Sequence, residues 1–231
     1  TGGTLYGIQT FGAFSNSYNY QIFNNTISNI TNISTSAVTY GIYAYYGGAN
    51  SNVYNNAISN VTAAGSGALY GIFSNFSDGK VYSNNISGLT GSGTGNVSGL
   101  AISGSTNPEF YRNKITNIQN TNAGGTAFGI SNISNNGTCR IYNNVIGNIN
   151  APAATNATTP IAADAVRGIS ITNTNASSSI IVDYNTIYLS ATSTGTNFSS
   201  SGIFHTSSAT ATTANLVLRN NIIINLSGTT G

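Results

Sequence analysis

The chain has 231 residues with six basic and four acidic side chains, and its formal net charge is +2. Globular domains ordinarily have about a quarter of their residues charged, so the polar surface here must come from Asn, Ser, Thr and Gly. So small a charge excludes nucleic acid as an expected partner. No apolar run reaches the ~18 residues of a membrane-spanning helix. This composition is typical of extracellular, carbohydrate-facing or fibrous proteins.

The first expected element is a strand around a Gly-Ile pair, and this pair returns along the whole chain. The pairs begin at Gly7, Gly41, Gly71, Gly129, Gly168 and Gly202, with Gly99-Leu100 as a variant. A second short strand then ends in an Asn-x-Ile motif, and a third strand follows it. The motif's Asn residues are Asn25, Asn56, Asn84, Asn113, Asn144, Asn185 and Asn221. Repeats of 28 to 41 residues without helical periodicity favour short strands.

Aligned repeats place apolar residues above one another in columns. One column is Ile22, Val53, Val81, Phe110, Ile141, Val182 and Leu218; a second is Ile27, Ile58, Ile86, Ile115, Ile146, Ile187 and Ile223. A third is Ile30, Val61, Leu89, Ile118, Ile149, Ser190 and Leu226. No single repeat could bury these side chains, whereas stacked repeats form a continuous core. Seven coils spaced by ~4.8 Å would make a right-handed rod of about 35 Å.

The Asn residues of the motif form a column of their own. Asn tolerates the left-handed backbone conformation that turns a corner, and stacked amides hydrogen-bond in a ladder. A shorter Asn column is expected at Asn29, Asn60, Asn117, Asn148 and Asn225. Both columns are interpreted as structural, so neither is expected to bind metal or to catalyse a reaction.

The Asn-Asn-x-Ile-x-Asn and Gly-Ile repeats resemble those of the right-handed parallel β-helix superfamily, which has the pectate-lyase-like fold, and repeat segments of secreted bacterial surface proteins and adhesins. The resemblance implies an all-β, right-handed parallel β-helix of about seven coils forming one domain over residues 1–231. The fold also carries lyases, hydrolases and phage tailspikes, so it does not select a function. The sequence starts and stops within the pattern, which suggests part of a longer array.

Polysaccharide cleavage by paired carboxylates needs two acids about 5 to 10 Å apart. Glu109 aligns between Lys80 and Arg140, as in a ladder of ion pairs, and Asp78 lies one repeat earlier. Asp183 falls on an otherwise aromatic outer column, where it aligns with Arg219 as a second pair. These alignments favour structural roles for the acids.

Asp164 and Arg167 lie in the longest insertion, residues 151–167, where a functional loop could form. Asp164 and Arg167 are only one acidic and one basic side chain, which is too few for a convincing catalytic site. The single histidine, His205, has no second ligand for a metal site, and the single cysteine, Cys139, reads as a small hydrophobic residue. We therefore expect no enzyme activity, no metal and no cofactor.

Aromatic residues recur on the expected outer surface. One column is Phe23, Tyr54, Tyr82, Tyr111 and Tyr142, and another contains Tyr43, Phe73 and Phe204. The first alternative is self-stacking that stiffens the rod. The second is a surface that contacts sugar rings or a partner protein.

The last two repeats place apolar residues on outer columns that carry polar residues earlier in the chain. These residues are Ile181, Val217, Ile222 and Ile224. Apolar residues on an outer face indicate a covered surface, so we expect a domain, a subunit or a loop to pack there.

Two functions follow from these patterns. The first is a non-catalytic structural or adhesive segment of an extracellular fibre or large cell-surface repeat protein, with adjoining coils or copies of the same protein as partners. The second is a module that binds or cleaves polysaccharide.

Overall fold

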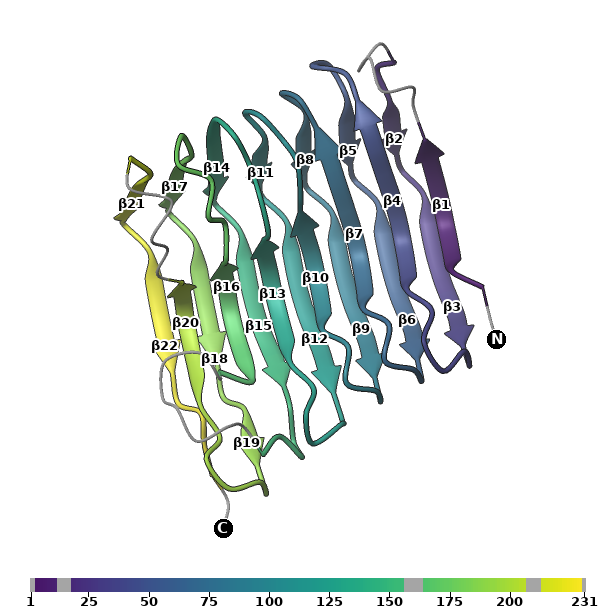
Figure 1. Ribbon diagram of the computed structural model, residues 1–231, viewed down its shortest axis with the longest axis vertical. Coiled ribbons are helices and arrows are strands. Elements are labelled where there is room, and N and C mark those ends of the chain that lie inside the picture. The colour runs from purple at the N-terminus through teal and green to yellow at the C-terminus, as the bar shows by residue number, and fades with distance from the viewer. Residues whose placement is uncertain (1–2, 12–17, 156–163, 207–212, 230–231) are drawn as a thin grey trace.

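The computed structural model describes residues 3–11, 18–155, 164–206 and 213–229. Three parallel sheets of seven strands each wind into a solenoid, whose coils follow one another from the N-terminal to the C-terminal end (Figure 1). The described residues form no helix. The expected all-β parallel β-helix with a buried Asn ladder is therefore confirmed.

Each coil contributes one strand to each sheet, so every sheet contains every third strand up to β18, after which the short β19 intervenes. Sheet A consists of β1 (Leu5–Phe11), β4 (Thr39–Gly47), β7 (Leu69–Phe76), β10 (Val97–Ile102), β13 (Ala127–Asn132), β16 (Val166–Ile171) and β20 (Ser200–His205). Sheet B consists of β2 (Gln21–Phe23), β5 (Asn52–Tyr54), β8 (Lys80–Tyr82), β11 (Glu109–Tyr111), β14 (Thr138–Tyr142), β17 (Ser179–Asp183) and β21 (Asn215–Arg219).

Sheet C follows sheet B after a tight bend. It consists of β3 (Thr26–Asn32), β6 (Ala57–Ala63), β9 (Asn85–Gly91), β12 (Lys114–Asn120), β15 (Val145–Asn150), β18 (Thr186–Leu189) and β22 (Ile222–Asn225). A small sheet pairs β19 (Thr192–Ser193) with β23 (Gly228–Thr229). Strand β16 begins inside the insertion predicted at residues 151–167, so Val166 and Arg167 belong to sheet A. Residues 156–163 of that insertion lie outside the described residues.

The first two predicted apolar columns are in register and form the core. Phe110 pairs with Val81 and Ile141, and Ile115 pairs with Ile86 and Ile146. All of them are buried. Because the strands are parallel and unshifted here, each inward side chain packs on its equivalent in the next coil.

The third predicted column is wrong in the last two coils. Leu189 is buried and Ser190 is exposed, while Leu226 is 68% exposed. Earlier coils carry one extra residue in left-handed conformation, as at Asn148 (φ 50°), and such a bulge shifts the next inward position by one residue. Strand β18 has no such residue, so simple alternation turns Leu189 inward.

The Asn ladder runs through every coil, but its residues do not make the left-handed bend, contrary to the prediction. The residue immediately before each ladder Asn adopts positive φ. These residues are Asn24, Asn55, Ser83, Arg112, Asn143, Tyr184 and Asn220. The bend thus falls on varied side chains, and the ladder Asn uses its amide to hold the bend in place.

The second Asn column is only partly a ladder. Asn60 donates to the Oδ1 of Asn29 at 3.5 Å, and Asn148 donates to Asn117. These four residues have positive φ. The left-handed backbone conformation that Asn tolerates is therefore found in this column. Asn225 pairs instead with Leu189 and donates to the Oγ of Ser200, so it does not belong to this column.

Candidate functional site

The outer face of sheet B carries an uninterrupted stack of aromatic rings. Neighbouring rings of Phe23, Tyr54, Tyr82, Tyr111 and Tyr142 have centroids 4.9 to 5.0 Å apart and planes within 10° of parallel. This spacing matches the distance between strands, so each ring lies directly above the next. The aromatic column predicted from the sequence is therefore present. Stacking of its rings on one another explains their parallel orientation. Phe23 is exposed and the four tyrosines are partly exposed, so the stack is accessible from outside.

Polar groups flank this column at its centre. Glu109 forms an ion pair with the Nζ of Lys80 at 3.6 Å and accepts a hydrogen bond from the Tyr142 hydroxyl at 2.8 Å. Burial and this hydrogen bond raise the pKa of Tyr142 above its ordinary value. Arg140, which pairs in register with Glu109, lies 5.3 Å from the Tyr142 ring centroid. Of the predicted Lys80–Glu109–Arg140 ladder, the structure therefore confirms the Lys80–Glu109 ion pair, whereas Arg140 contacts the aromatic column in place of Glu109.

A second aromatic cluster covers the N-terminal half of sheet A, and sequence reasoning found only part of it. Tyr6, Tyr40 and Tyr70 stack with centroids 5.2 and 5.4 Å apart. Tyr43 and Phe73, which were predicted, stack beside them at 5.4 Å. The missed tyrosines all precede the Gly of a Gly-Ile pair, so the repeat contained the signal. Burial, followed by repulsion from neighbouring tyrosines, raises the pKa of Tyr43 to about 12.

Small residues interrupt this cluster and leave a hollow on sheet A. Ser98 takes the place of Tyr70 in the next coil, and Phe128 follows it in the same column. The hollow has a volume of about 250 Å³, and both rings line it together with Arg167 and several Ser and Thr side chains. Tyr70 is partly exposed beside the hydroxyl groups of the hollow, whereas Phe128 is only 7% exposed.

Arg167 is the buried cation of this hollow, with only 6% of its surface exposed. Its guanidinium carbon lies 3.5 Å from the Phe204 ring centroid and 5.2 Å from that of Phe128. Nη1 donates to the Oγ of Ser170 at 3.0 Å. Burial lowers the pKa of Arg167, and the charge of Asp164 partly opposes that effect.

The remaining acids have separate partners. Asp78 accepts a hydrogen bond from Asn107 at 2.7 Å. Asp164 accepts one from the Ser201 hydroxyl. Asp183 is buried, although it was expected on the surface, because Arg219 covers it with hydrogen bonds of 2.9 and 3.1 Å. Each acid thus has a role in the scaffold.

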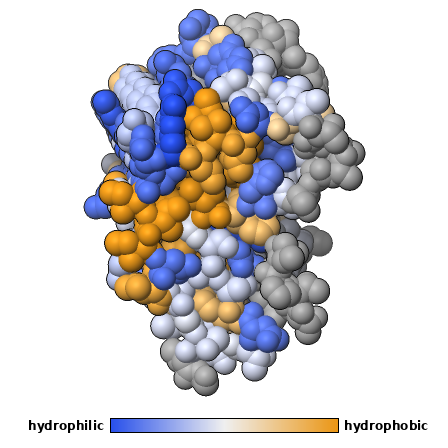
Figure 2. Space-filling model, turned by 90° about the vertical axis from the view of Figure 1, so that its left-hand side faces the viewer, coloured by the Kyte–Doolittle hydropathy of each residue, from blue (hydrophilic) through white to orange (hydrophobic). Residues whose placement is uncertain are grey.

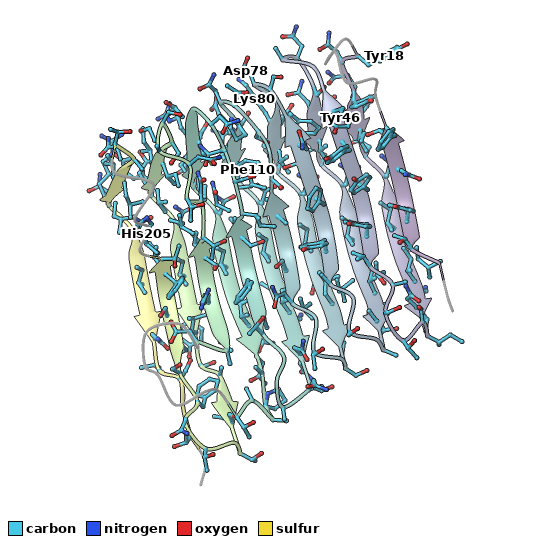
Figure 3. All side chains as sticks on the ribbon, in the orientation of Figure 1. Tyr18, Tyr46, Asp78, Lys80, Phe110 and His205 are labelled. Atoms are coloured by element: carbon cyan, nitrogen blue, oxygen red, sulfur yellow. The ribbon has the colours of Figure 1, made fainter. Side chains whose placement is uncertain are left out.

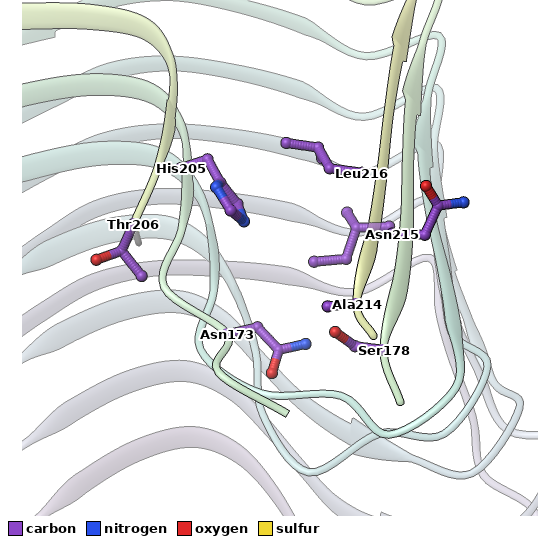
Figure 4. A pocket seen from close by; sticks show the side chains of 8 residues that line it. Asn173, Ser178, His205, Thr206, Ala214, Asn215 and Leu216 are labelled. Atoms are coloured by element: carbon purple, nitrogen blue, oxygen red, sulfur yellow. The ribbon is translucent and has the colours of Figure 1, made fainter. Parts of the chain in front are cut away.

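His205 is far along the solenoid from Asp78 and Lys80 (Figure 3). It pairs with Ile171 in register and lines a cavity of about 110 Å³ together with Asn173 and Ser178 (Figure 4). The described residues contain no group of three or more His, Cys, Asp or Glu able to hold a metal ion. Cys139 is buried, and burial raises its pKa to about 12.

The apolar residues predicted as a packing interface lie on outer columns. Ile181 and Val217 follow Arg140 on sheet B. Ile222 and Ile224, which are 59% and 45% exposed, lie beside Thr186 and Tyr188 on sheet C. Hydrophobic residues gather on the face at the C-terminal end of the solenoid (Figure 2). The isoleucines are open in the single chain, and their covering partner remains a prediction.

Comparisons with models of known protein families, with characterised proteins and with solved structures give no match. No helix in the described part of the chain has the length and hydrophobicity needed to cross a membrane.

Proposed function

We propose that the chain is a non-catalytic structural or adhesive segment of an extracellular fibre or a large cell-surface repeat protein. The observation that carries this proposal is the unbroken Asn ladder. From Asn25 to Asn221, every ladder Asn donates its side-chain amide to the next one at 2.9 to 3.0 Å. A ladder that joins all coils suits a rod that transmits force or spans distance.

The surface chemistry supports an extracellular location. Charged residues are 4% of the chain, and its outer polar positions are mostly Asn, Ser and Thr. The aromatic column of sheet B supplies the adhesive surface in this proposal, because stacked rings present a rigid apolar strip at little cost in side-chain entropy.

Labelling of intact cells tests the proposal. An antibody against the purified chain should mark fibres or the cell surface in electron micrographs, and the purified chain should release no product from pectin or alginate. Label confined to the cell interior, or turnover of either polysaccharide, would contradict the proposal.

The second candidate function is polysaccharide binding, and the hollow on sheet A favours it. The partly exposed Tyr70 supplies an aromatic surface next to the hydroxyl groups of Ser98, Thr126 and Ser131, and Phe128 and Arg167 form the buried wall of the hollow. Binding of the chain to a panel of immobilised glycans tests this function. Tyr70→Ala should weaken binding at least tenfold, whereas Tyr54→Ala on sheet B should leave it unchanged. Equal effects of the two variants would argue against the hollow.

A further inference from the structure

The basic side chains of the protein gather on one part of its surface. Four of the six lie in the third, fourth and fifth coils, beside the aromatic column of sheet B. We call them the basic cluster, and all four are exposed: Lys80, Arg112, Lys114 and Arg140. In a chain with so few charged residues, this concentration marks one region of the surface as different from the rest.

The basic cluster carries the whole net charge of the protein. Its four cations share these three coils with two acids, Asp78 and Glu109, which leaves a charge of +2. The other two basic residues, Arg167 and Arg219, are matched in number by Asp164 and Asp183. The formal charge of the full chain is also +2, so the remainder of the solenoid is neutral.

The cations lie on both sides of the stacked rings. Lys80 and Arg140 begin or precede the last turn of their short strands, in the outer column two residues before the rings of β8 and β14. Arg112 makes the left-handed bend directly after Tyr111, and Lys114 takes the first outer position of sheet C. Because successive coils are ~4.8 Å apart, the rings form a strip with positive charge along both margins.

The acid inside the cluster is already bound. Glu109 is half-buried, lies 3.6 Å from the Nζ of Lys80 and accepts the hydrogen bond of the Tyr142 hydroxyl. The other three cations of the cluster form no ion pair with a carboxylate of the described residues. Their charges are therefore directed to the solvent, where they attract anions.

We infer that this strip of sheet B binds an anionic polysaccharide, whose sugar units carry carboxylate or sulfate groups. The polymer would lie along the solenoid axis over the rings, with its negative groups against the cations at both margins. The hydroxyls of the partly exposed Tyr82 and Tyr111 can donate hydrogen bonds to sugar hydroxyls and accept them. The inference rests on the proposed adhesive role of the aromatic column and names the class of its ligand.

A polysaccharide fits this strip better than other polyanions do. Proteins that bind nucleic acid commonly neutralise about 6 to 10 phosphates, which is more than four cations can reach. An acidic peptide needs pockets for its side chains, whereas the rings stack face to face and offer edges and hydroxyl groups. The neighbouring side chains Asn52, Ser83 and Asn143 are accessible and add neutral hydrogen-bonding groups, as the hydroxyls of a sugar chain require.

Binding to matched polymers tests the inference. The purified chain should bind immobilised dextran sulfate, alginate or both in biolayer interferometry, and neutral dextran should bind more weakly by a factor of about ten or more. Added salt should weaken the binding, because exposed charges are screened beyond about 8 Å at physiological ionic strength. Binding of dextran as tight as that of both anionic polymers would overturn the inference.

Charge variants locate the binding on the basic cluster. The double variant Arg112→Gln and Lys114→Gln should weaken binding about tenfold, since each surface charge contact contributes about two- to fivefold. The matched control is the double variant Gln9→Glu and Thr31→Glu, which lowers the net charge equally in the first coil. All four side chains are exposed, so both variants should keep the thermal midpoint of the unaltered chain. Equal losses of binding in the two variants would show attraction by net charge alone and would contradict the inference.

Two further measurements separate this site from its alternatives. Tyr70→Ala should leave binding of the anionic polymer unchanged, and a tenfold loss would place the polymer in the hollow on sheet A. Tighter binding of polyglutamate or of single-stranded DNA would assign the strip to another class of polymer. Cell-surface labelling without binding to either anionic polysaccharide would refute this inference alone, whereas binding with label confined to the cell interior would refute the proposed function alone.

Discussion

The side chain and backbone of Asn84 both donate to the Oδ1 of Asn113, through Nδ2 at 3.0 Å and through N–H at 3.1 Å. The same Nδ2 also donates to the carbonyl of Val53 in the preceding coil at 2.9 Å. One amide thus joins three successive coils at the bend between sheets B and C. Since the next coils repeat this arrangement, the ladder is a property of the whole solenoid.

Removal of a central ladder residue should destabilise the fold strongly. Asn113→Ala would leave the buried N–H of Asn84 and the Oδ1 of Asn144 with fewer partners. Because an orphaned buried polar group costs about 1 to 3 kcal/mol, we expect a loss of about 2 to 4 kcal/mol in the free energy of unfolding. Urea denaturation measures it. The half-buried end residue Asn25 gives the control: Asn25→Ala should cost less than half as much, and equal losses would contradict the ladder account.

A Cβ at the Gly-Ile pair should also be costly. At Gly129 a Cβ would lie 2.6 Å from the carbonyl oxygen of Gly168 and 2.5 Å from a methyl carbon of Ile146. We expect Gly129→Ala to destabilise the chain by about 1 to 3 kcal/mol, as overpacking does. At Gly124 the nearest atom would be 3.7 Å away, so Gly124→Ala should leave the thermal midpoint nearly unchanged. A neutral Gly129→Ala variant would show that the coils are less tightly spaced than described.

The ion pair of the buried Asp183 should matter more than the surface pair of Lys80 and Glu109, although the Arg219 side chain is itself 53% exposed. Arg219→Ala leaves the buried carboxylate of Asp183 without its partner, and we expect a loss of about 2 kcal/mol or more. Lys80→Ala breaks a pair at the surface and should cost about 0 to 1 kcal/mol. Denaturation of the two variants under the same conditions compares them. The reverse ranking would be inconsistent with the burial of Asp183.

Alkaline pH should destabilise the tyrosine cluster of sheet A. The pKa of Tyr43 is raised from 10.0 in the unfolded chain to about 12 in the folded chain. Its contribution to stability is therefore complete below pH 10 and is lost as the pH rises towards 12. Ultraviolet titration should show ionisation of Tyr43 near pH 12, and Tyr43→Phe should remove that part of the pH dependence. A titration of all tyrosines near their ordinary pKa would contradict burial of the cluster.

The fold could be predicted from the sequence because each structural position recurs in every repeat, so its preferred residue type is visible several times. The column from Ile27 to Ile223 could be read without error, since its members recur at the same distance from the ladder Asn. The left-handed bend was assigned one residue too late because Asn24-Asn25 and Asn55-Asn56 are both Asn-Asn pairs. Ser83 and Arg112 at the equivalent positions hold the same conformation and give no sequence signal for it.

The errors in the last coils and on the surface have physical causes. Strand β18 lacks the left-handed residue that bulges the equivalent strands of the earlier coils, so Leu189 points inward. The alternation of the earlier coils includes that residue and therefore predicted Ser190 at the inward position. Arg167 lines the hollow and lies against Phe204, which belongs to the next coil and is paired in register with Ser170. Such a site emerges only when the coils are stacked in three dimensions.

Diffraction or electron cryo-microscopy of the assembled protein tests the central claim most directly. A structural solenoid should lie in the fibre with its strands perpendicular to the fibre axis and with a spacing of ~4.8 Å along that axis. Fibres whose strands run along the axis would contradict it.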